Sequence, residues 1–113
     1  MNIDTVLAAT LKIANSIAQH QYASAIQMCD HARMTEDDLK RVIEEYGRTF
    51  VQLPTNFGEY VDAVIIEVPP LPAWSVQVPL WTLEEGRSDL TLELTVTERI
   101  EGLIIELDDL RVL

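Results

Sequence analysis

The chain has 113 residues and a mass of 12.8 kDa, which suits one folded domain and is too little for two. Its 48% hydrophobic and 24% charged residues are ordinary for a globular protein and exclude a disordered, collagen-like or disulfide-framed chain. The formal charge of −11 arises mainly in residues 59–113, which hold twelve acidic and three basic side chains. We therefore expect binding neither to nucleic acid nor to an anionic membrane, since phosphates need cationic partners. The surplus of acids either serves solubility alone or attracts a basic protein.

The N-terminal segment and the single cysteine bear on the compartment. Cys29 has no second cysteine in the chain, so no internal disulfide can form. The first residues lack a basic segment, and no apolar run approaches the roughly 18 residues that a membrane helix needs. We expect no signal peptide and no membrane span, with the cytoplasm as the compartment.

Three amphipathic helices are predicted in the first half of the chain. Apolar residues at i, i+3 and i+4 spacing mark one helix over about residues 3–19 and a shorter one over about residues 22–31. The third helix has the clearest boundaries. Thr35 is a favourable N-cap with Asp38 three residues later, and Gly47 stands where helices commonly end.

From residue 49 the apolar pattern changes to the alternation that is typical of strands. A short strand is predicted over residues 49–53. A longer one follows over residues 60–68, and because both of its faces are apolar we expect it to be central or covered on both sides. Residues 73–82 form the next strand, in which Pro79 indicates an edge or a bulge. Between these strands, the prolines of Pro69–Pro72 predict a stiff connector.

The last strands return along the sheet. Residues 90–97 alternate leucine and valine with threonine and glutamate, so one face is buried and the other points outward or into a partner. The chain turns at Ile100–Gly102, and a change of parity near Asp108–Asp109 predicts a β-bulge. The fold class is therefore α+β, a single domain over residues 1–113. Its three N-terminal helices pack on one face of a curved antiparallel sheet of about five strands.

A family resemblance rests on three motifs. They are Ala73-Trp74-Ser75-Val76 with Leu80-Trp81-Thr82, then Glu84-Glu85-Gly86-Arg87-Ser88-Asp89-Leu90-Thr91-Leu92, and the pair of Glu45-Tyr46-Gly47 with the acidic C-terminal Asp108–Leu113. In these the chain resembles a family of small, uncharacterised bacterial domains over roughly residues 20–113. The resemblance implies a layout similar to the cystatin-like and nuclear-transport-factor-2-like rolls. Such rolls serve as isomerases, dehydratases, immunity proteins and dimerisation modules, so the fold does not choose a function.

No cofactor or metal site is predicted. His20 and His31 lie eleven residues apart, and the consecutive Cys29, Asp30 and His31 point about 100° apart on a helix, so they cannot converge on one ion. We interpret Cys29 as an inert thiol on the apolar side of its helix.

Asp62 is the one candidate catalytic residue. It shares its predicted strand face with Tyr60, Val64 and Ile66. A carboxylate in an apolar pocket would have a raised pKa suited to proton abstraction, as a small isomerase- or dehydratase-like enzyme requires. The alternative is a solvated carboxylate near the start of a strand.

The candidate interaction residues lie in and beside a polar turn. Glu84, Glu85 and Asp89 surround Arg87, which indicates either a turn held by Arg87 or a recognition loop for a basic partner. Trp81 stands on the mixed face of its strand, where it would serve as an exposed anchor. Our leading hypothesis is a non-enzymatic protein-interaction domain that binds a basic protein, immunity-like or regulatory, and pairs with itself as a homodimer. The enzyme with Asp62 as general base is the alternative.

Overall fold

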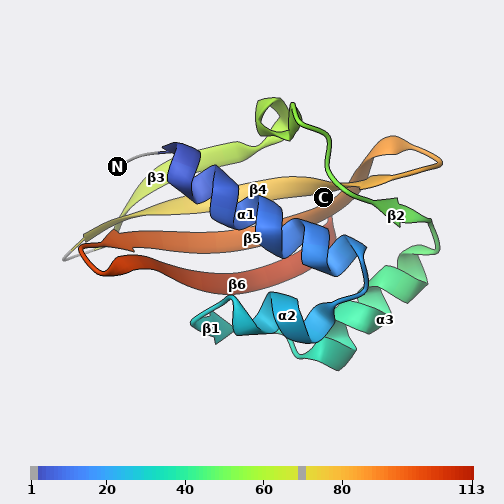
Figure 1. The fold of residues 1–113 in the computed structure, drawn as a ribbon, viewed down its shortest axis with the longest axis horizontal. Helices are drawn as coiled ribbons and strands as arrows, with labels where there is room; N and C mark the ends of the chain where they lie inside the picture. The colour runs from blue at the N-terminus through green and yellow to red at the C-terminus, as the bar shows by residue number, and fades with distance from the viewer. Residues whose placement is uncertain (1–2, 69–70) are drawn as a thin grey trace.

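The computed structural model describes residues 3–68 and 71–113, which form two layers (Figure 1). A long helix lies across one face of a curled six-stranded sheet, and two shorter helices lie beside the sheet's lower edge. The shortest dimension is 21 Å, as expected for one helix layer on one sheet. In chain order the elements are α1 (Ile3–Ala18), α2 (Tyr22–Gln27), β1 (His31–Ala32), α3 (Glu36–Tyr46), β2 (Phe50–Val51), the 3-10 helix η1 (Phe57–Tyr60), β3 (Asp62–Val68), β4 (Leu71–Thr82), β5 (Gly86–Arg99) and β6 (Gly102–Val112).

The sheet is a meander with short additions at both sides. Strands β3, β4, β5 and β6 pair antiparallel in sequence order, while β2 pairs with the far end of β4. At the other side β1 pairs with β6 in parallel. The predicted α+β class is confirmed. The sheet is mixed rather than purely antiparallel, because β1 pairs with β6 in parallel. The sequence pattern does not predict this strand, since it extends the second helix to about residue 31.

The core lies between α1 and the sheet. Alternate side chains of β4, β5 and β6 point toward α1 and pack against its apolar stripe. The apolar spacing of α1 in the sequence is explained by this packing. The buried side chains of this layer include Val6, Ile13 and Ile17 of α1, Val76, Val78 and Leu80 of β4, Leu90, Leu92, Leu94 and Val96 of β5, and Ile105, Leu107 and Leu110 of β6.

The boundaries of α3 agree with the prediction. The Thr35 hydroxyl accepts from the Asp38 backbone N–H at 3.1 Å, and the Asp38 carboxylate accepts from the Thr35 backbone N–H at 2.9 Å. Gly47 ends the helix with φ 72°, a left-handed conformation in which a Cβ is unfavourable. The reciprocal cap and the glycine stop thus define this helix locally.

Strand β3 differs from its prediction. It pairs with β4 alone among the described residues, so it is an edge strand and the expectation of a central or doubly covered position is wrong. Val64 and Ile65 point to opposite faces and are 52% and 54% exposed. A strand that is apolar on both faces is usually buried on both, and here that rule fails.

Both irregularities predicted from the sequence are present. In the pairing of β4 with β5 the register shifts between Pro79 and Trp81. Pro79 also lies where β4 has no neighbour on its outer side, after the last β3 partner at Gln77 and before the β2 partners. Its missing N–H is therefore not needed. The register of β5 with β6 shifts between Glu93 and Leu94, opposite Asp108, which confirms the predicted bulge.

Two further comparisons complete the fold. The connector predicted over Pro69–Pro72 falls in part outside the described residues, and from Leu71 the chain is β4. Of the helices in the described part of the chain, none is both long and apolar enough to cross a membrane.

Candidate functional site

The sheet face that points away from α1 carries many of the polar side chains of the strands. We call it the open face. The register places the following side chains on it: Asp62, Val64 and Ile66 of β3, Ser75 and Gln77 of β4, Glu93, Thr95 and Thr97 of β5, and Ile104, Glu106, Asp108, Asp109 and Arg111 of β6. The wet face predicted for residues 90–97 is part of it, so that prediction is confirmed in its orientation.

Two carboxylates of the open face share one cation. Glu93 and Asp109 stand directly opposite each other on β5 and β6, an arrangement that repels unless a cation intervenes. Arg111 supplies it, with its Nε 2.6 Å from Glu93 Oε1 and 3.8 Å from Asp109 Oδ2. The Gln77 side chain also donates to Glu93 at 2.9 Å. The Arg111 hydrogen bond holds the pKa of Glu93 below its ordinary value, and the Gln77 hydrogen bond adds to this, so Glu93 stays ionised.

Asp108 is less well compensated. The Thr95 hydroxyl donates to its Oδ2 at 2.7 Å, which lowers the pKa of this carboxyl. Partial burial raises the pKa more strongly, and the charges of Glu106 and Glu93 raise it further while the charge of Arg33 lowers it, so the net direction is upward. Glu106 itself pairs with Arg33 at 3.1 Å. Asp108 is thus an open-face carboxylate whose ionised form is disfavoured by its surroundings.

Asp62 lies at the start of β3, exposed on the open face and opposite Gln77. The apolar pocket that a general base would need is not formed around it, because the face it shares with Val64 and Ile66 points away from α1 and from the core. The exposed position agrees with the other alternative, a solvated carboxylate near the start of a strand. His20 and Tyr22 contact each other, with the Tyr22 hydroxyl 2.9 Å from His20 Nδ1.

The polar turn has partners inside the molecule. Between β4 and β5 the chain reverses over residues 83–85, which is shorter than the turn predicted. The Glu84 carboxylate accepts from the backbone N–H and the hydroxyl of Thr49, both at 2.9 Å, and these bonds lower the pKa of Glu84. Glu85 accepts from the Tyr46 hydroxyl at 2.8 Å and lies 3.6 Å from Arg48. Both glutamates therefore tie the turn to the segment between α3 and β2.

Of the remaining candidate interaction residues, Arg87 and Trp81 contact Tyr60, whereas Asp89 contacts Tyr46. Arg87 lies over the Tyr60 ring, with its guanidinium carbon 5.9 Å from the ring centre. This contact joins Arg87 to η1, the 3-10 helix that precedes β3. The Trp81 ring meets the same tyrosine edge-on at 5.2 Å and is half-buried, so it is not a free anchor. Asp89 is exposed, and its backbone N–H donates to the Tyr46 hydroxyl at 3.3 Å.

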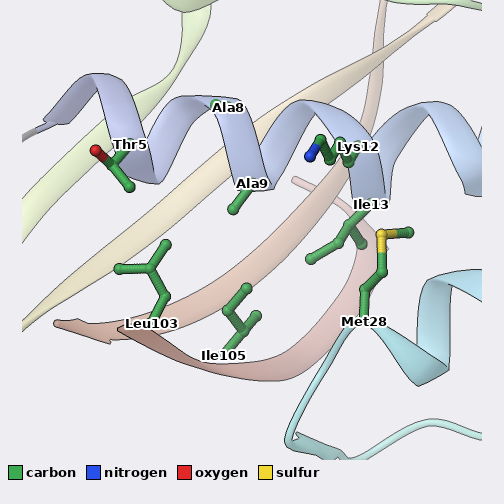
Figure 2. A pocket seen from close by; sticks show the side chains of 8 residues that line it. All are labelled: Thr5, Ala8, Ala9, Lys12, Ile13, Met28, Leu103 and Ile105. Carbon is green, nitrogen blue, oxygen red and sulfur yellow. The ribbon is translucent and has the colours of Figure 1, made fainter. Parts of the chain in front are cut away.

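An apolar groove of about 310 Å³ lies between α1 and β6 (Figure 2). No local pattern in the sequence indicates this groove, because its lining comes from three separate segments of the chain. The small Ala8 and Ala9 leave room between larger residues of α1, which is the one feature that could have indicated it. Lys12 brings a cation to the groove, and no carboxylate lines it. The lining residues are Thr5, Ala8, Ala9, Lys12, Ile13, Met28, Leu103 and Ile105.

Cys29 and the histidines form no common site. In the described residues, no three histidine, cysteine or carboxylate side chains gather as metal ligands do. The Cys29 thiol is half-buried and donates to the Ala25 carbonyl at 3.4 Å. Burial, with a smaller effect of Asp30, raises its pKa to about 11, so the thiol is protonated at neutral pH.

These features define a two-layer α+β domain with one bare, acidic sheet face. The chain belongs to a family described as a domain of unknown function (DUF7668), whose family model matches residues 14–113. This agrees with the resemblance drawn over residues 20–113. No curated protein and no solved structure matches the chain significantly, so the likeness to cystatin-like rolls stays a prediction.

Proposed function

We propose that the protein is a non-enzymatic interaction domain whose open face binds a basic segment of a partner protein. The observation that carries the proposal is the charge on that face. Its carboxylates are Asp62, Glu93, Glu106, Asp108 and Asp109, and the cations that reach them are Arg33 and Arg111. Strands hold these groups in fixed register, so their field is preorganised for a cationic partner.

Asp108 and Glu106 form the centre of the proposed contact. Both lie on β6, and Asp108 is partly buried, with the carboxylates of Glu106 and Glu93 and the Arg33 guanidinium as its charged neighbours. A lysine or arginine of the partner placed beside them would relieve this repulsion and would lower the pKa of Asp108. Binding would then weaken as the pH falls through the range in which Asp108 becomes protonated, and only within that range would it release protons.

The turn residues Glu84 and Glu85 contribute less to the proposed contact. Their carboxylates already accept hydrogen bonds from Thr49 and Tyr46, which a partner would have to replace. A domain of this kind acts by covering the basic surface of its partner, in the manner of an immunity-like or regulatory protein.

A lysine-rich peptide of about twelve residues, labelled with a fluorophore, tests the proposal by anisotropy. The variant Glu106→Gln/Asp108→Asn removes two charges from the open face. The control Glu36→Gln/Asp37→Asn removes two exposed charges from the first turn of α3 and has the same net charge. We expect the open-face variant to bind at least about tenfold more weakly and the control about twofold, with both losses shrinking in high salt. Equal losses in the two variants would show that net charge, rather than the open face, attracts the peptide.

A further inference from the structure

The two long sides of the sheet are protected very differently. At β6 the outer edge is covered by β1 and by the residues around it. The Asp30 N–H donates to the Ile105 carbonyl, and the Asp30 carboxylate accepts from the Ile105 N–H, both at 2.8 Å. The Arg33 N–H donates to the Leu107 carbonyl at 2.9 Å. A carboxylate on an edge strand is a common device against pairing with another chain.

Strand β3 has no such protection in the described residues. It extends over seven residues and pairs on one side, with β4. Its central segment Ala63–Ile66 holds no charged residue, and Val64 and Ile65 expose more than half of their surface. An exposed apolar edge strand is a template for a further strand.

The orientation of the backbone groups follows from the β6 edge. The backbone N–H and C=O of Ile105 point outward and bond to Asp30. Ile105 and Val96, which lie opposite each other, therefore form a non-hydrogen-bonded pair. Val96 therefore directs its own groups to the other side, toward Trp74 of β4.

The same alternation continues across β4. Because the backbone N–H and C=O of Trp74 point toward β5, those of Ser75 point toward β3 and exchange hydrogen bonds with the backbone of Val64. The Leu83 N–H, which donates to Thr49 on the same side of β4, agrees with this parity. On β3 the alternation therefore directs the backbone N–H and C=O groups of Ala63 and Ile65 away from β4, toward the open edge of the sheet.

We propose that β3 pairs antiparallel with β3 of a second copy of this chain, about a two-fold axis at Val64. In this register Val64 faces its own counterpart, and Ala63 faces Ile65 of the second copy, with each pair sharing one sheet face. The small Ala63 leaves room for the larger Ile65. Asp62 stands opposite Ile66 rather than opposite another carboxylate, so the pairing brings no like charges into direct opposition.

We favour a second copy of the chain over an unrelated strand as the partner, because a single register matches the side chains of β3 with their counterparts on both faces. A two-fold axis perpendicular to the sheet places both α1 helices on one side and both open faces on the other. Dimerisation is opposed by electrostatic repulsion between the two copies, each with a formal charge of −11, and salt screens this repulsion. Dimerisation should therefore tighten with salt, while binding of a basic peptide to the open face weakens with it.

Disulfide trapping tests the register directly. In a Cys29→Ala background, Val64→Cys places its thiol opposite its counterpart, where Cα atoms of a non-hydrogen-bonded pair are about 4.5 Å apart. The control Ile66→Cys lies opposite residue 62, so its two copies are more than about 13 Å apart. With oxidised glutathione as oxidant, we expect a covalent dimer from Val64→Cys and none from Ile66→Cys. A dimer formed equally by both, or by neither, would overturn the proposal.

Light scattering tests the association without added cysteines. We expect the dimer dissociation constant to fall from 50 to 500 mM NaCl. Ile65→Pro, which removes an outward N–H, should raise it at least about tenfold while the circular dichroism is unchanged. The same variant should bind the lysine-rich peptide as the wild type does, which separates this proposal from that of the open face. A wild-type chain that stays monomeric near 0.5 mM in high salt would refute self-pairing and leave the edge to a different protein.

Discussion

The cap on the β6 edge can be removed with a single substitution, Asp30→Ala. The Asp30 carboxylate accepts from the backbone N–H of Ile105 at 2.8 Å, while a separate bond joins the Asp30 N–H to the Ile105 carbonyl. Alanine deletes the first bond and leaves the second. Since Ile105 is 7% exposed, its freed N–H is poorly placed to find water.

The size of the effect follows from that burial. A hydrogen bond to a charged acceptor contributes about 1.5–3 kcal/mol when shielded, and partial exposure of the carboxylate reduces this to about 1–2 kcal/mol. For a domain of this length, each 1 kcal/mol lowers the melting temperature by roughly 3–6 °C. Urea unfolding followed by circular dichroism measures the loss as a lower midpoint at constant slope.

The matched control is Asp30→Asn, which keeps a side-chain oxygen as acceptor and removes the charge. We expect it to lose less than half of what Asp30→Ala loses. Equal losses would show that the charge acts and the hydrogen bond does not. An unchanged Asp30→Ala would mean that solvent reaches the Ile105 N–H, and the account of the protected edge would fail. Removal of the carboxylate also exposes a second strand edge, so Asp30→Ala should aggregate faster at high concentration.

Three further predictions concern single residues. Asp108→Asn should raise the free energy of unfolding at pH 7 by less than about 1 kcal/mol, because the folded protein raises the pKa of this carboxyl and so binds the proton more tightly than the unfolded chain. Ionised Asp108 destabilises the fold increasingly as the pH rises through the range in which this carboxyl loses its proton. The stability gained by Asp108→Asn should therefore vanish in urea titrations near pH 3. Gly47→Ala should cost about 1–2 kcal/mol in thermal melts, since φ is 72° and a Cβ meets no atom closer than 3.8 Å, which leaves conformation as the sole penalty. Cys29, with its pKa raised to about 11, should react with iodoacetamide at pH 8 far more slowly in the native protein than in urea; equal rates would contradict the burial.

Local signals in the sequence were sufficient for much of the fold. Thr35, Asp38 and Gly47 define α3 through contacts within a few residues, and the parity change at Asp108–Asp109 revealed the bulge. Neither depends on where other elements pack. The half-buried pattern of residues 90–97 was similarly self-contained, because one face of β5 is core and the other is not.

What sequence reasoning missed depends on distant partners. The alternation around Val64 shows apolar faces but not whether a neighbour covers them, and β3 proved to be an edge. For Asp62 the sequence left a pocket and a solvated position open, because the pattern does not say which of the two apolar faces of β3 meets α1. The partners of Glu84 and Glu85 come from residues 46–49, more than thirty positions earlier, so the turn resembled a free acidic loop.

The order of strands β3 to β6 has a consequence for how the chain folds. Each of these strands pairs with its immediate successor, so the sheet can grow by successive hairpins with little loop entropy lost at each step. Helix α1 packs mainly on β4 and β5, which begin more than fifty residues after it ends, and it therefore has no complete surface to dock on until the meander exists. We expect substitutions in the β4–β5 hairpin to slow folding, whereas substitutions at Ile13 or Ile17 mainly accelerate unfolding.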